Sequence, residues 1–386
     1  MKILMLNWDS FGQEYIIKEF QEAQCDVILH DWPFGIENMR ENQILCRQLE
    51  ERIETCNCKL VFSLNFFPVA AKACNKCGVK YVSWIYDTPY LLLYSKHIKY
   101  DTNIVCFFDK SLYYEFRKQK LNNVYYLPLA APVQEYDRIG INVSGKYDAD
   151  ISFVGSTYQE QRQNFYGLLE GVNDYTKGYL NAIMQMQKEV YGSFLLEELL
   201  TEPVLKELHR VCPIERGKDE WESEAWIYAN YFLARKLTGE QRTELLNELG
   251  KHFEVKLYTP EKTPNIIGVK NCGSVDYVSQ MPLVFKESKI NLNMTLRSIK
   301  SGIPLRAMDI MGCGGFLLTN YQQDFEDYFE NGRDYVYYTD SNDLINKVEY
   351  YLTHTEEREE IARSGYEKIV NNHTYKHRIA EILNMV

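Results

Sequence analysis

Positive charge and long apolar runs are both scarce in this chain of 386 residues. Its 43 Lys and Arg residues are outnumbered by 54 Asp and Glu residues, which leaves a formal net charge of −11. Proteins that bind nucleic acid or anionic membrane surfaces rely on excess positive charge, so both classes are disfavoured. No apolar stretch approaches the roughly 18 residues of a membrane-spanning helix, and we expect no membrane span. Any site for an anionic ligand must therefore be local.

Targeting segments and disulfide frameworks are lacking too. The apolar run at Met1–Leu6 is interrupted by Lys2 and is too short for the core of a signal peptide. The ten cysteines are scattered through the chain, as is typical of reduced, buried thiols. These features predict a cytoplasmic protein.

Four of the cysteines raise the question of structural zinc. Cys56, Cys58, Cys74 and Cys77 lie near helix ends that a β-α unit brings to the same side of a sheet. The first pair is spaced C-x-C rather than C-x-x-C, and small thiols are common among buried helix residues. We expect packing roles for these four residues and no zinc.

Two common nucleotide-binding motifs are absent. A nicotinamide dehydrogenase needs G-x-G-x-x-G after its first strand, and the segment Asn7–Gly12 lacks it. The G-x-x-x-x-G-K-[ST] sequence of P-loop proteins is missing as well. Dehydrogenases and P-loop NTPases are therefore disfavoured.

Short apolar runs alternate with helical patterns along the first third of the chain. This alternation predicts a parallel sheet covered by helices on both faces. Pro128, Pro132 and a polar stretch to Asp150 then interrupt the pattern, as an interdomain linker would. We predict strands at residues 2–6, 26–29, 59–64, 80–85, 103–108 and 123–127.

A second series of strands begins at Ile151 and is interrupted early. A helical stretch to about Glu170 and a helical insertion at about 172–250 precede its next strand. Residues 195–250 hold 12 acidic and 7 basic residues, which indicates a solvated acidic face. Strands are predicted at 151–155, 254–258, 290–294, 316–318 and 334–338, and helices at 303–311, 324 onwards, 341–352, 356–371 and 375–385. We therefore predict an α/β fold with two Rossmann-like domains, residues 1–145 and 146–371.

Polar and aromatic residues that follow the first strands are candidates for a site. In twin α/β domains, the ligand crevice lies at the carboxyl ends of the strands. An aromatic ring at such an edge can stack on a sugar. The candidates on the first domain are Asn7, Asp9, His30, Asp31, Asn65 and Asp87, together with the aromatic residues Trp8 and Tyr86.

The segment Met294–Gly315 carries the most informative pattern of the second domain. Ser301 or Gly302 can cap a helix whose first turn contains Pro304. The N–H groups of such a helix end attract anions. The alternative is an ordinary buried helix with a glycine-rich end, and the pattern alone favours neither.

Charged residues flank that helix start. Arg297 and Lys300 precede it and can add positive charge to a diphosphate site. Asp309 lies one to two turns into the helix, where a carboxylate can accept hydrogen bonds from ribose hydroxyls. The three side chains together would suit a nucleoside diphosphate.

Several separated motifs resemble the CgeB-like (spore maturation type) family of glycosyltransferases, which has the GT-B fold. The matching segments are Trp8–Gly12, Phe62–Pro68, Val82–Pro89, Asp150–Gly155, Lys289–Asn293 and Gly302–Thr319. The resemblance implies two Rossmann-like domains facing a cleft, with the acceptor on the N-terminal domain and a nucleotide-sugar donor on the C-terminal one. It also implies that residues 372–386 form a helix that crosses back to the N-terminal domain.

By position, the resemblance also assigns donor contacts. Gly155 and Ser156 would approach the donor phosphates with help from Arg162, and Tyr258 and Thr259 would lie by the nucleotide. Retaining relatives carry two glutamates eight positions apart, and this chain has Ser301 and Asp309 there. Asp309 can still bind ribose, whereas Ser301 cannot supply the first acid. The helix start contributes Ser301, Gly302, Ile303, Pro304 and Leu305.

The resulting prediction is a glycosyltransferase that takes a sugar from a nucleotide-diphosphate sugar, for which we expect UDP. Arg297 and Lys300 would stabilise the departing diphosphate, so that no metal or other cofactor is required. Asp87 or Asp9 would be the base if transfer inverts, and would orient the acceptor if it retains, the outcome towards which the prediction leans.

The acceptor stays open and could be a protein, a glycan or a small molecule. One rival prediction is a nucleotide-sugar epimerase or phosphorylase of the same fold. Another is a catalytically silent nucleotide-sugar-binding or spore-coat assembly protein. Consumption of the donor without an acceptor, or transfer of the sugar to phosphate, would identify the enzymatic rivals. Tight UDP binding without any turnover would identify the silent one.

Overall fold

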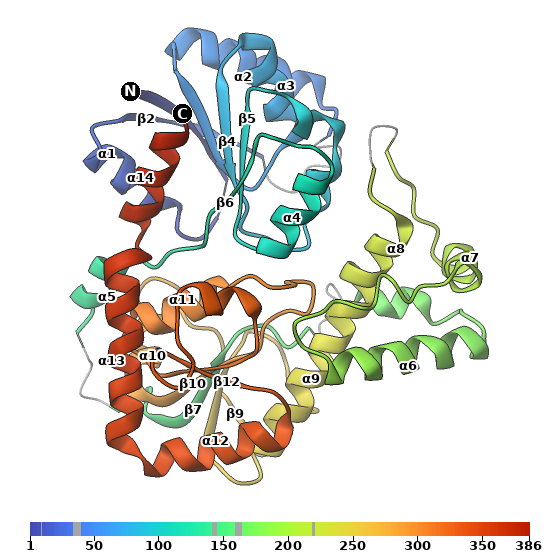
Figure 1. Cartoon of the computed structure of the whole chain (residues 1–386), viewed down its shortest axis with the longest axis vertical. Coiled ribbons are helices and arrows are strands. Elements are labelled where there is room, and N and C mark those ends of the chain that lie inside the picture. Colours follow the sequence, from blue (N-terminus) through green and yellow to red (C-terminus); the bar gives the residue numbers. More distant parts are fainter. Residues whose placement is uncertain (9, 34–39, 141–144, 159–163, 218–220) are drawn as a thin grey trace. The chain divides into compact units, whose positions relative to one another are not determined.

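The computed structural model describes the chain apart from residues 9, 34–39, 141–144, 159–163 and 218–220. It divides into two compact units, each with one sheet of six parallel strands (Figure 1). The predicted α/β fold with two Rossmann-like domains is confirmed. Unit 1 comprises Met1–Pro132, Arg216–Glu222 and Asn372–Val386, and unit 2 comprises Val133–Glu215 and Ser223–Asn371.

The sheet of unit 1 contains all six strands expected from the apolar runs. Its strands are β1 (Lys2–Asn7), β2 (Asp26–Asp31), β3 (Leu60–Leu64), β4 (Lys80–Trp84), β5 (Asn103–Phe107) and β6 (Val124–Tyr126). Its helices are α1 (Gln13–Glu22), α2 (Gln43–Cys56), α3 (Pro68–Cys77), α4 (Lys110–Lys118) and α14 (Tyr375–Met385), with 3-10 turns η1 (Leu91–Tyr94) and η2 (Lys96–Lys99). The strand order is β2-β1-β3-β4-β5-β6. The central strands β3 and β5 are buried along their whole length, as helices on both faces require.

The last helix, α14, packs against α1 within unit 1. Tyr375 is 1% exposed, and its ring lies 5.6 Å from that of Tyr15 and 6.1 Å from that of Trp84. Gly12 precedes α1 with a φ of 83°, and a Cβ there would lie 2.5 Å from the Tyr375 hydroxyl. Glycine is therefore required at the start of α1 both for its backbone conformation and for the approach of α14.

The sheet of unit 2 has the strand order β12-β11-β10-β7-β8-β9. Its strands are β7 (Ala149–Val154), β8 (Val255–Tyr258), β9 (Lys270–Asn271), β10 (Ser288–Asn293), β11 (Leu317–Asn320) and β12 (Val336–Tyr338). Helices α10 (Met281–Glu287), α11 (Leu305–Gly312), α12 (Ser341–Thr353) and α13 (Thr355–Asn372) and the 3-10 turn η6 (Gln323–Asp327) complete the fold. Strand β9 was not predicted, because two exposed residues carry no apolar pattern. The helix predicted from residue 324 is only the short turn η6.

The region between β7 and β8 is helical, as predicted. It contains η4 (Phe165–Leu169), α6 (Asp174–Glu189), α7 (Glu202–Val211), α8 (Glu224–Ile227), the π-helix η5 (Tyr228–Leu233) and α9 (Ala234–Leu249). The helical stretch predicted up to Glu170 is present in the described residues only as the 3-10 turn η4. Figure 1 shows α6, α7 and α8 projecting from unit 2, whereas α9 returns to its sheet. None of the helices in the described ranges combines the length and apolar character of a membrane span.

The chain passes from unit 1 to unit 2 at Pro132 and Val133, earlier than the predicted residue 145. The reason is helix α5 (Val133–Arg138), whose Tyr136 is fully buried in unit 2. Lys286 donates hydrogen bonds to the carbonyls of Tyr136 and Ile139 at 2.6 and 2.8 Å. Two prolines and a polar composition predicted a linker, but these tertiary contacts place α5 in the second unit.

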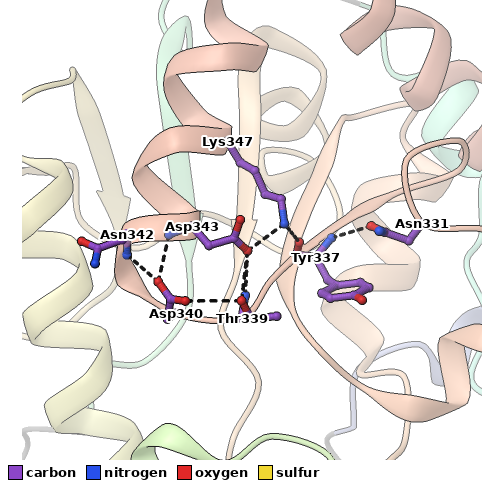
Figure 2. Close-up of polar contacts among 7 residues, drawn as sticks. All are labelled: Asn331, Tyr337, Thr339, Asp340, Asn342, Asp343 and Lys347. Carbon is purple, nitrogen blue, oxygen red and sulfur yellow. Dashed lines mark hydrogen bonds and ion pairs between the residues drawn. The ribbon is translucent and has the colours of Figure 1, made fainter.

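Helix α12 illustrates how the ends of unit 2 elements are fixed (Figure 2). Asp340 Oδ1 accepts the backbone N–H groups of Asn342 and Asp343 at 2.8 and 2.9 Å, which caps the helix. Lys347 donates to Asp343 Oδ2 and to the Tyr337 carbonyl, both at 2.7 Å. The first turn of α12 is thereby tied to the end of strand β12.

Candidate functional site

Each sheet reverses its strand order once, between β1 and β3 in unit 1 and between β7 and β10 in unit 2. We call these two positions the switch points. In open α/β sheets, ligands bind outside the carboxyl ends of the strands at such positions. Each switch point is therefore a candidate site of its own unit, and the two are described separately.

At the switch point of unit 1, the predicted residues Asn7 and Trp8 hold the edge together. Trp8 Nε1 donates to the Leu64 carbonyl at 3.0 Å, so the indole links the end of β1 to the end of β3. Asn7 Nδ2 donates to Asp31 Oδ1 at 2.8 Å, which links β1 to β2. The predicted Asp9 lies outside the described residues. Asn7 and Trp8 thus hold together the ends of β1, β2 and β3 at this edge of unit 1.

The structure brings the predicted residues Asn65 and Asp87 together. Asn65 Nδ2 donates to Asp87 Oδ2 at 2.7 Å, and Asn65 Oδ1 accepts the backbone N–H groups of Tyr86 and Asp87 at 2.9 and 3.1 Å. Asn65 is fully buried and has a φ of 59°, a conformation that asparagine tolerates better than most residues. Asp87 itself is exposed. Its carboxylate is therefore both accessible and oriented.

Tyr86 lies beside this pair and is half-buried. Its ring meets that of Trp84 edge-on at 5.1 Å, and its hydroxyl donates to the Tyr375 hydroxyl at 3.1 Å. Helix α14 thus fixes the orientation of Tyr86 from the far end of the sequence. That contact has no signal in the sequence around Tyr86.

At the switch point of unit 2, the loop after β7 contains the predicted Gly155 and Ser156. Gly155 N–H donates to the Tyr258 carbonyl at 3.1 Å, which extends the pairing of β7 with β8. Ser156 Oγ donates to the Glu261 carboxylate, and so do the backbone N–H of Thr157, at 2.9 Å, and the Thr157 hydroxyl. Glu261 is 3% exposed. The hydrogen-bond donors of this loop are therefore held by Glu261, a buried acid that the sequence analysis did not select.

Tyr258 and Thr259, at the end of β8, are both buried. The Tyr258 ring lies 6.2 Å from that of Tyr147, and Thr259 is 1% exposed. Their side chains therefore belong to the interior of unit 2. The predicted Arg162 lies outside the described residues.

Arg242, on α9, is the main residue of this edge that sequence reasoning missed. It is 8% exposed, and its Nε donates to the Met294 carbonyl at 3.1 Å while its Nη1 donates to the Ser156 carbonyl at 2.5 Å. Its Nη2 also donates to Met294. Burial lowers the pKa of this guanidinium. Arg242 was counted as part of a solvated helical face, and only the packing of α9 on the sheet shows that its side chain points inward.

Arg297 lies on the loop after β10, but its side chain is directed into the helical region. Its guanidinium donates to Gln241 Oε1 at 2.7 Å and to the carbonyls of Lys188 and Val190 at 2.9 and 3.2 Å. It also stacks 3.7 Å from the centre of the Tyr191 ring. These contacts attach the loop to α6 and α9, and the contact of Arg297 with a diphosphate stays a prediction.

Lys300 remains near the surface of the same loop. Its ammonium group lies 5.6 Å from the centre of the Phe194 ring. A cavity of about 10 Å³ separates residues 192–194 from this loop, room for roughly one water molecule. Lys300 thus lies half-buried beside this small cavity, whereas Arg297 attaches the loop to the neighbouring helices.

The helix start differs from the prediction. Pro304 is the N-cap of α11, which begins at Leu305, and no side chain caps it. Ser301, Gly302, Ile303 and Pro304 are buried. The Ser301 carbonyl accepts the Asp324 N–H at 3.0 Å. The predicted cap at Ser301 or Gly302 is therefore wrong, because residues 301–304 run as a buried segment before the helix.

Asp309 is 1% exposed and lies in the middle of α11. Its Oδ1 accepts the hydroxyls of Tyr136 and Tyr277 at 2.9 and 3.1 Å, and Arg306 lies 3.5 Å from its Oδ2. Burial raises the pKa of Asp309 to about 6, against the opposing effects of Arg306 and the two tyrosines. In this structure, the carboxylate predicted to bind ribose is covered by tyrosine side chains.

The four cysteines considered for zinc lie on and beside α2 and α3. Burial raises the pKa of Cys74, and burial with a hydrogen bond to Cys56 raises that of Cys58 to about 12. The part of the chain that the structure describes contains no cluster of three or more metal-binding side chains. Raised thiol pKa values favour protonated side chains, which suits packing roles.

Solved structures share the architecture of both units. Sucrose-phosphate synthase from Thermosynechococcus elongatus is 8% identical, with a TM-score of 0.57 over 100% of this chain and 98% of that one. HepE from Anabaena, in complex with UDP-glucose, is 11% identical, with a TM-score of 0.56 over 100% of both chains. A glycosyltransferase from Rickettsia africae is 10% identical, with a TM-score of 0.51 over 100% of this chain and 97% of that one. The chain therefore has the GT-B fold.

A second comparison concerns the sequence of the C-terminal part of the chain. Residues 238–384 match the model of a glycosyl transferase-like family. The match begins in α9, close to Arg242, and runs through α11 to α14. A comparison with curated proteins finds no match. This C-terminal part of the chain is thus similar in sequence to a glycosyl transferase-like family.

Proposed function

We propose that this protein is a glycosyltransferase that moves a sugar from a nucleotide-diphosphate sugar to the hydroxyl group of an acceptor. The match of residues 238–384 to a glycosyl transferase-like family carries the proposal. The GT-B fold and a polar switch point in each unit support it. The narrower CgeB-like assignment and its link to spore maturation stay predictions.

A uridine-based donor is our preferred substrate. The structure of HepE holds UDP-glucose, and a trehalose-phosphate synthase from Burkholderia xenovorans, described as UDP-forming, has a TM-score of 0.54 to this chain at 10% identity. In this chain the donor would lie at the switch point of unit 2, beside Ser156 and the loop before α11. Lys300 is the cation of that loop with which we expect the diphosphate to interact.

Asp87 is the residue of unit 1 best suited to act on the acceptor. Asn65 holds its Oδ2, which orients an exposed carboxylate towards an incoming hydroxyl. If Asp87 takes the acceptor proton, the sugar is transferred with inversion. If Asp87 only orients the acceptor, the outcome is retention, the alternative favoured by the sequence resemblance. The anomeric configuration of the product, measured by NMR, separates the two.

A thermal-shift screen against UDP-, GDP-, ADP- and dTDP-sugars tests the proposal. A ligand that binds only the folded state raises the melting temperature, and we expect the largest increase with a UDP-sugar. The absence of a shift with every nucleotide sugar would overturn the proposed function. Product analysis with and without phosphate then separates a transferase from an epimerase or a phosphorylase.

A further inference from the structure

The switch point of unit 2 is spanned by one buried side chain. Arg242 donates to the carbonyl of Ser156, just after β7, and to that of Met294, just after β10. These are the two neighbouring strands between which the sheet reverses its order. The guanidinium therefore links the two sides of the crevice that a doubly wound sheet presents to a ligand.

The environment of Arg242 favours a fixed position. Its guanidinium lies 4.9 Å from the Tyr158 ring centre and 5.3 Å from that of Phe153. It forms no ion pair in the described ranges, so backbone carbonyls take the place of a carboxylate. Burying a cation in this way is costly unless a defined geometry compensates for it. A guanidinium can meet two separated carbonyls at once, which an ammonium group does poorly.

Helix α9 also contacts the loop after β7 directly. A Cβ on Gly239 would lie 3.0 Å from the Thr157 carbonyl oxygen and 3.4 Å from the Tyr158 Cβ. Glu261 also contacts this loop and accepts hydrogen bonds from Ser156 and Thr157. Arg242 of α9 therefore binds a backbone carbonyl of the loop, and Glu261 accepts hydrogen bonds from the loop's N–H and O–H groups.

We propose that Arg242 is a positioning residue, which sets the separation of Ser156 and Met294 and thereby forms the crevice for the diphosphate of the nucleotide sugar. This inference rests on the proposed function, but its structural part does not. Arg242 reaches no ligand itself and acts through the two loops that it joins. The helical region after β7 then contributes to the donor site through α9.

Three variants of Arg242 separate the role of the fork, meaning the planar guanidinium group that reaches two carbonyls at once, from the role of the positive charge. Arg242→Lys keeps the charge and loses the fork, Arg242→Gln keeps donors and loses the charge, and Arg242→Met loses both. Arg235→Met is the matched control, because Arg235 lies on the same helix over the rings of Phe165 and Tyr231. Gly239→Ala keeps Arg242 but pushes α9 away from Thr157.

The first measurement is amide hydrogen exchange in the protein without ligand. In Arg242→Lys and Arg242→Met we expect exchange at least tenfold faster in peptides covering 153–158 and 293–298, and unchanged rates in Arg235→Met. Wild-type exchange rates in both Arg242→Lys and Arg242→Met would overturn the positioning role. If Arg242→Met does not fold, Arg242→Lys decides, because it retains the charge and most of the stem.

The second measurement is the affinity for UDP, determined by calorimetry. We expect a loss of at least tenfold in Arg242→Lys and Gly239→Ala and no change in Arg235→Met. Equal affinity of Arg242→Lys and the wild type would overturn the link to the donor site. If the wild type binds neither UDP nor a UDP-sugar, the proposed function fails, while the exchange experiment still decides whether Arg242 positions the loops.

Discussion

The two switch points solve the same structural problem with different side chains. In unit 1, Trp8 donates one neutral N–H to the Leu64 carbonyl at the end of β3. In unit 2, Arg242 donates several N–H groups to the carbonyls of Ser156 and Met294. Each side chain joins the ends of the two neighbouring strands between which the strand order of its sheet reverses. The difference is charge: the bridge of unit 2 brings a buried cation to the edge where we place an anionic donor.

The two acids considered for the site, Asp87 of unit 1 and Asp309 of unit 2, differ in their exposure to solvent. Asp87 is exposed and held by Asn65, whereas Asp309 is buried beneath Tyr136 and Tyr277. An oriented, exposed carboxylate suits proton transfer or acceptor binding. A buried carboxylate with two hydroxyl donors suits the stability of the fold. We therefore expect substitution of Asp87 to affect activity first and substitution of Asp309 to affect stability first.

The strongest test of this comparison is Asp87→Asn. We expect sugar transfer to fall by about 10²–10⁴-fold, because the amide cannot accept a proton or bind the acceptor hydroxyl as a carboxylate does. The melting temperature and the affinity for UDP should stay at wild-type values. Steady-state kinetics with a UDP-sugar and calorimetry measure the two effects. Asp101→Asn is the control, because Asp101 is an exposed acid two residues before β5. Equal activity of Asp87→Asn and this control would remove Asp87 from the mechanism.

The second test is Asp309→Ala, which should affect stability first. The substitution leaves the Tyr136 hydroxyl buried without its acceptor, and we expect the free energy of unfolding to fall by about 2–4 kcal/mol. Asp309→Asn keeps an oxygen for both tyrosines and should lose much less. Urea unfolding of unit 2 provides the measurement. A stable Asp309→Ala protein that has lost UDP binding would instead favour the predicted ribose contact.

The third test uses pH. Because burial raises the pKa of Asp309 from 3.8 to about 6, the folded state keeps a proton that the unfolded chain has already lost. The contribution of this group to stability is therefore complete below pH 3.8 and is lost as pH rises to about 6. Relative to Asp309→Asn, wild-type stability should fall by about 2–3 kcal/mol across this range. Parallel stability profiles of the two proteins between pH 4 and 7 would contradict the burial of an ionisable group here.

The smallest expected effect concerns Asp340, the cap of α12 (Figure 2). Asp340→Ala removes the acceptor of two backbone N–H groups and should cost about 1 kcal/mol. Asp340→Ser restores a capping oxygen and should recover most of this loss. UDP affinity should not change in either variant, as calorimetry can verify. A drop in affinity would extend the donor edge to the outermost strand β12.

The fold was largely predictable because it depends on local patterns. All six strands of unit 1 and the strands at 151–155, 254–258 and 290–294 lie within a few residues of their predicted positions. Buried parallel strands are short apolar runs, and these remain visible in a single sequence. Strand β9 and helix α5 were not predicted, since their places depend on neighbours rather than on their own residues.

The site was predictable in part. Asn65 and Asp87 follow neighbouring strands, and this rule brought them together correctly. Arg297 and Ser301 also obey the rule by position, yet one side chain turns towards α9 and the other lies in a buried segment. Spacing along the chain predicts the edge at which a residue lies, but not the direction of a long side chain.

By itself, the sequence determined two parallel sheets, the helical region between β7 and β8, and the edges that carry polar residues, because strand periodicity and strand ends are local properties. Tertiary structure alone decided which charges face inward. Arg242 and Asp309 are ordinary charged residues on helical patterns, and only the packing of α9 and α11 on the sheet buries them. Burial depends on contacts between segments distant in sequence. No local pattern therefore reveals that Arg242 joins the loops after β7 and β10 or that Asp309 accepts hydrogen bonds from two tyrosines.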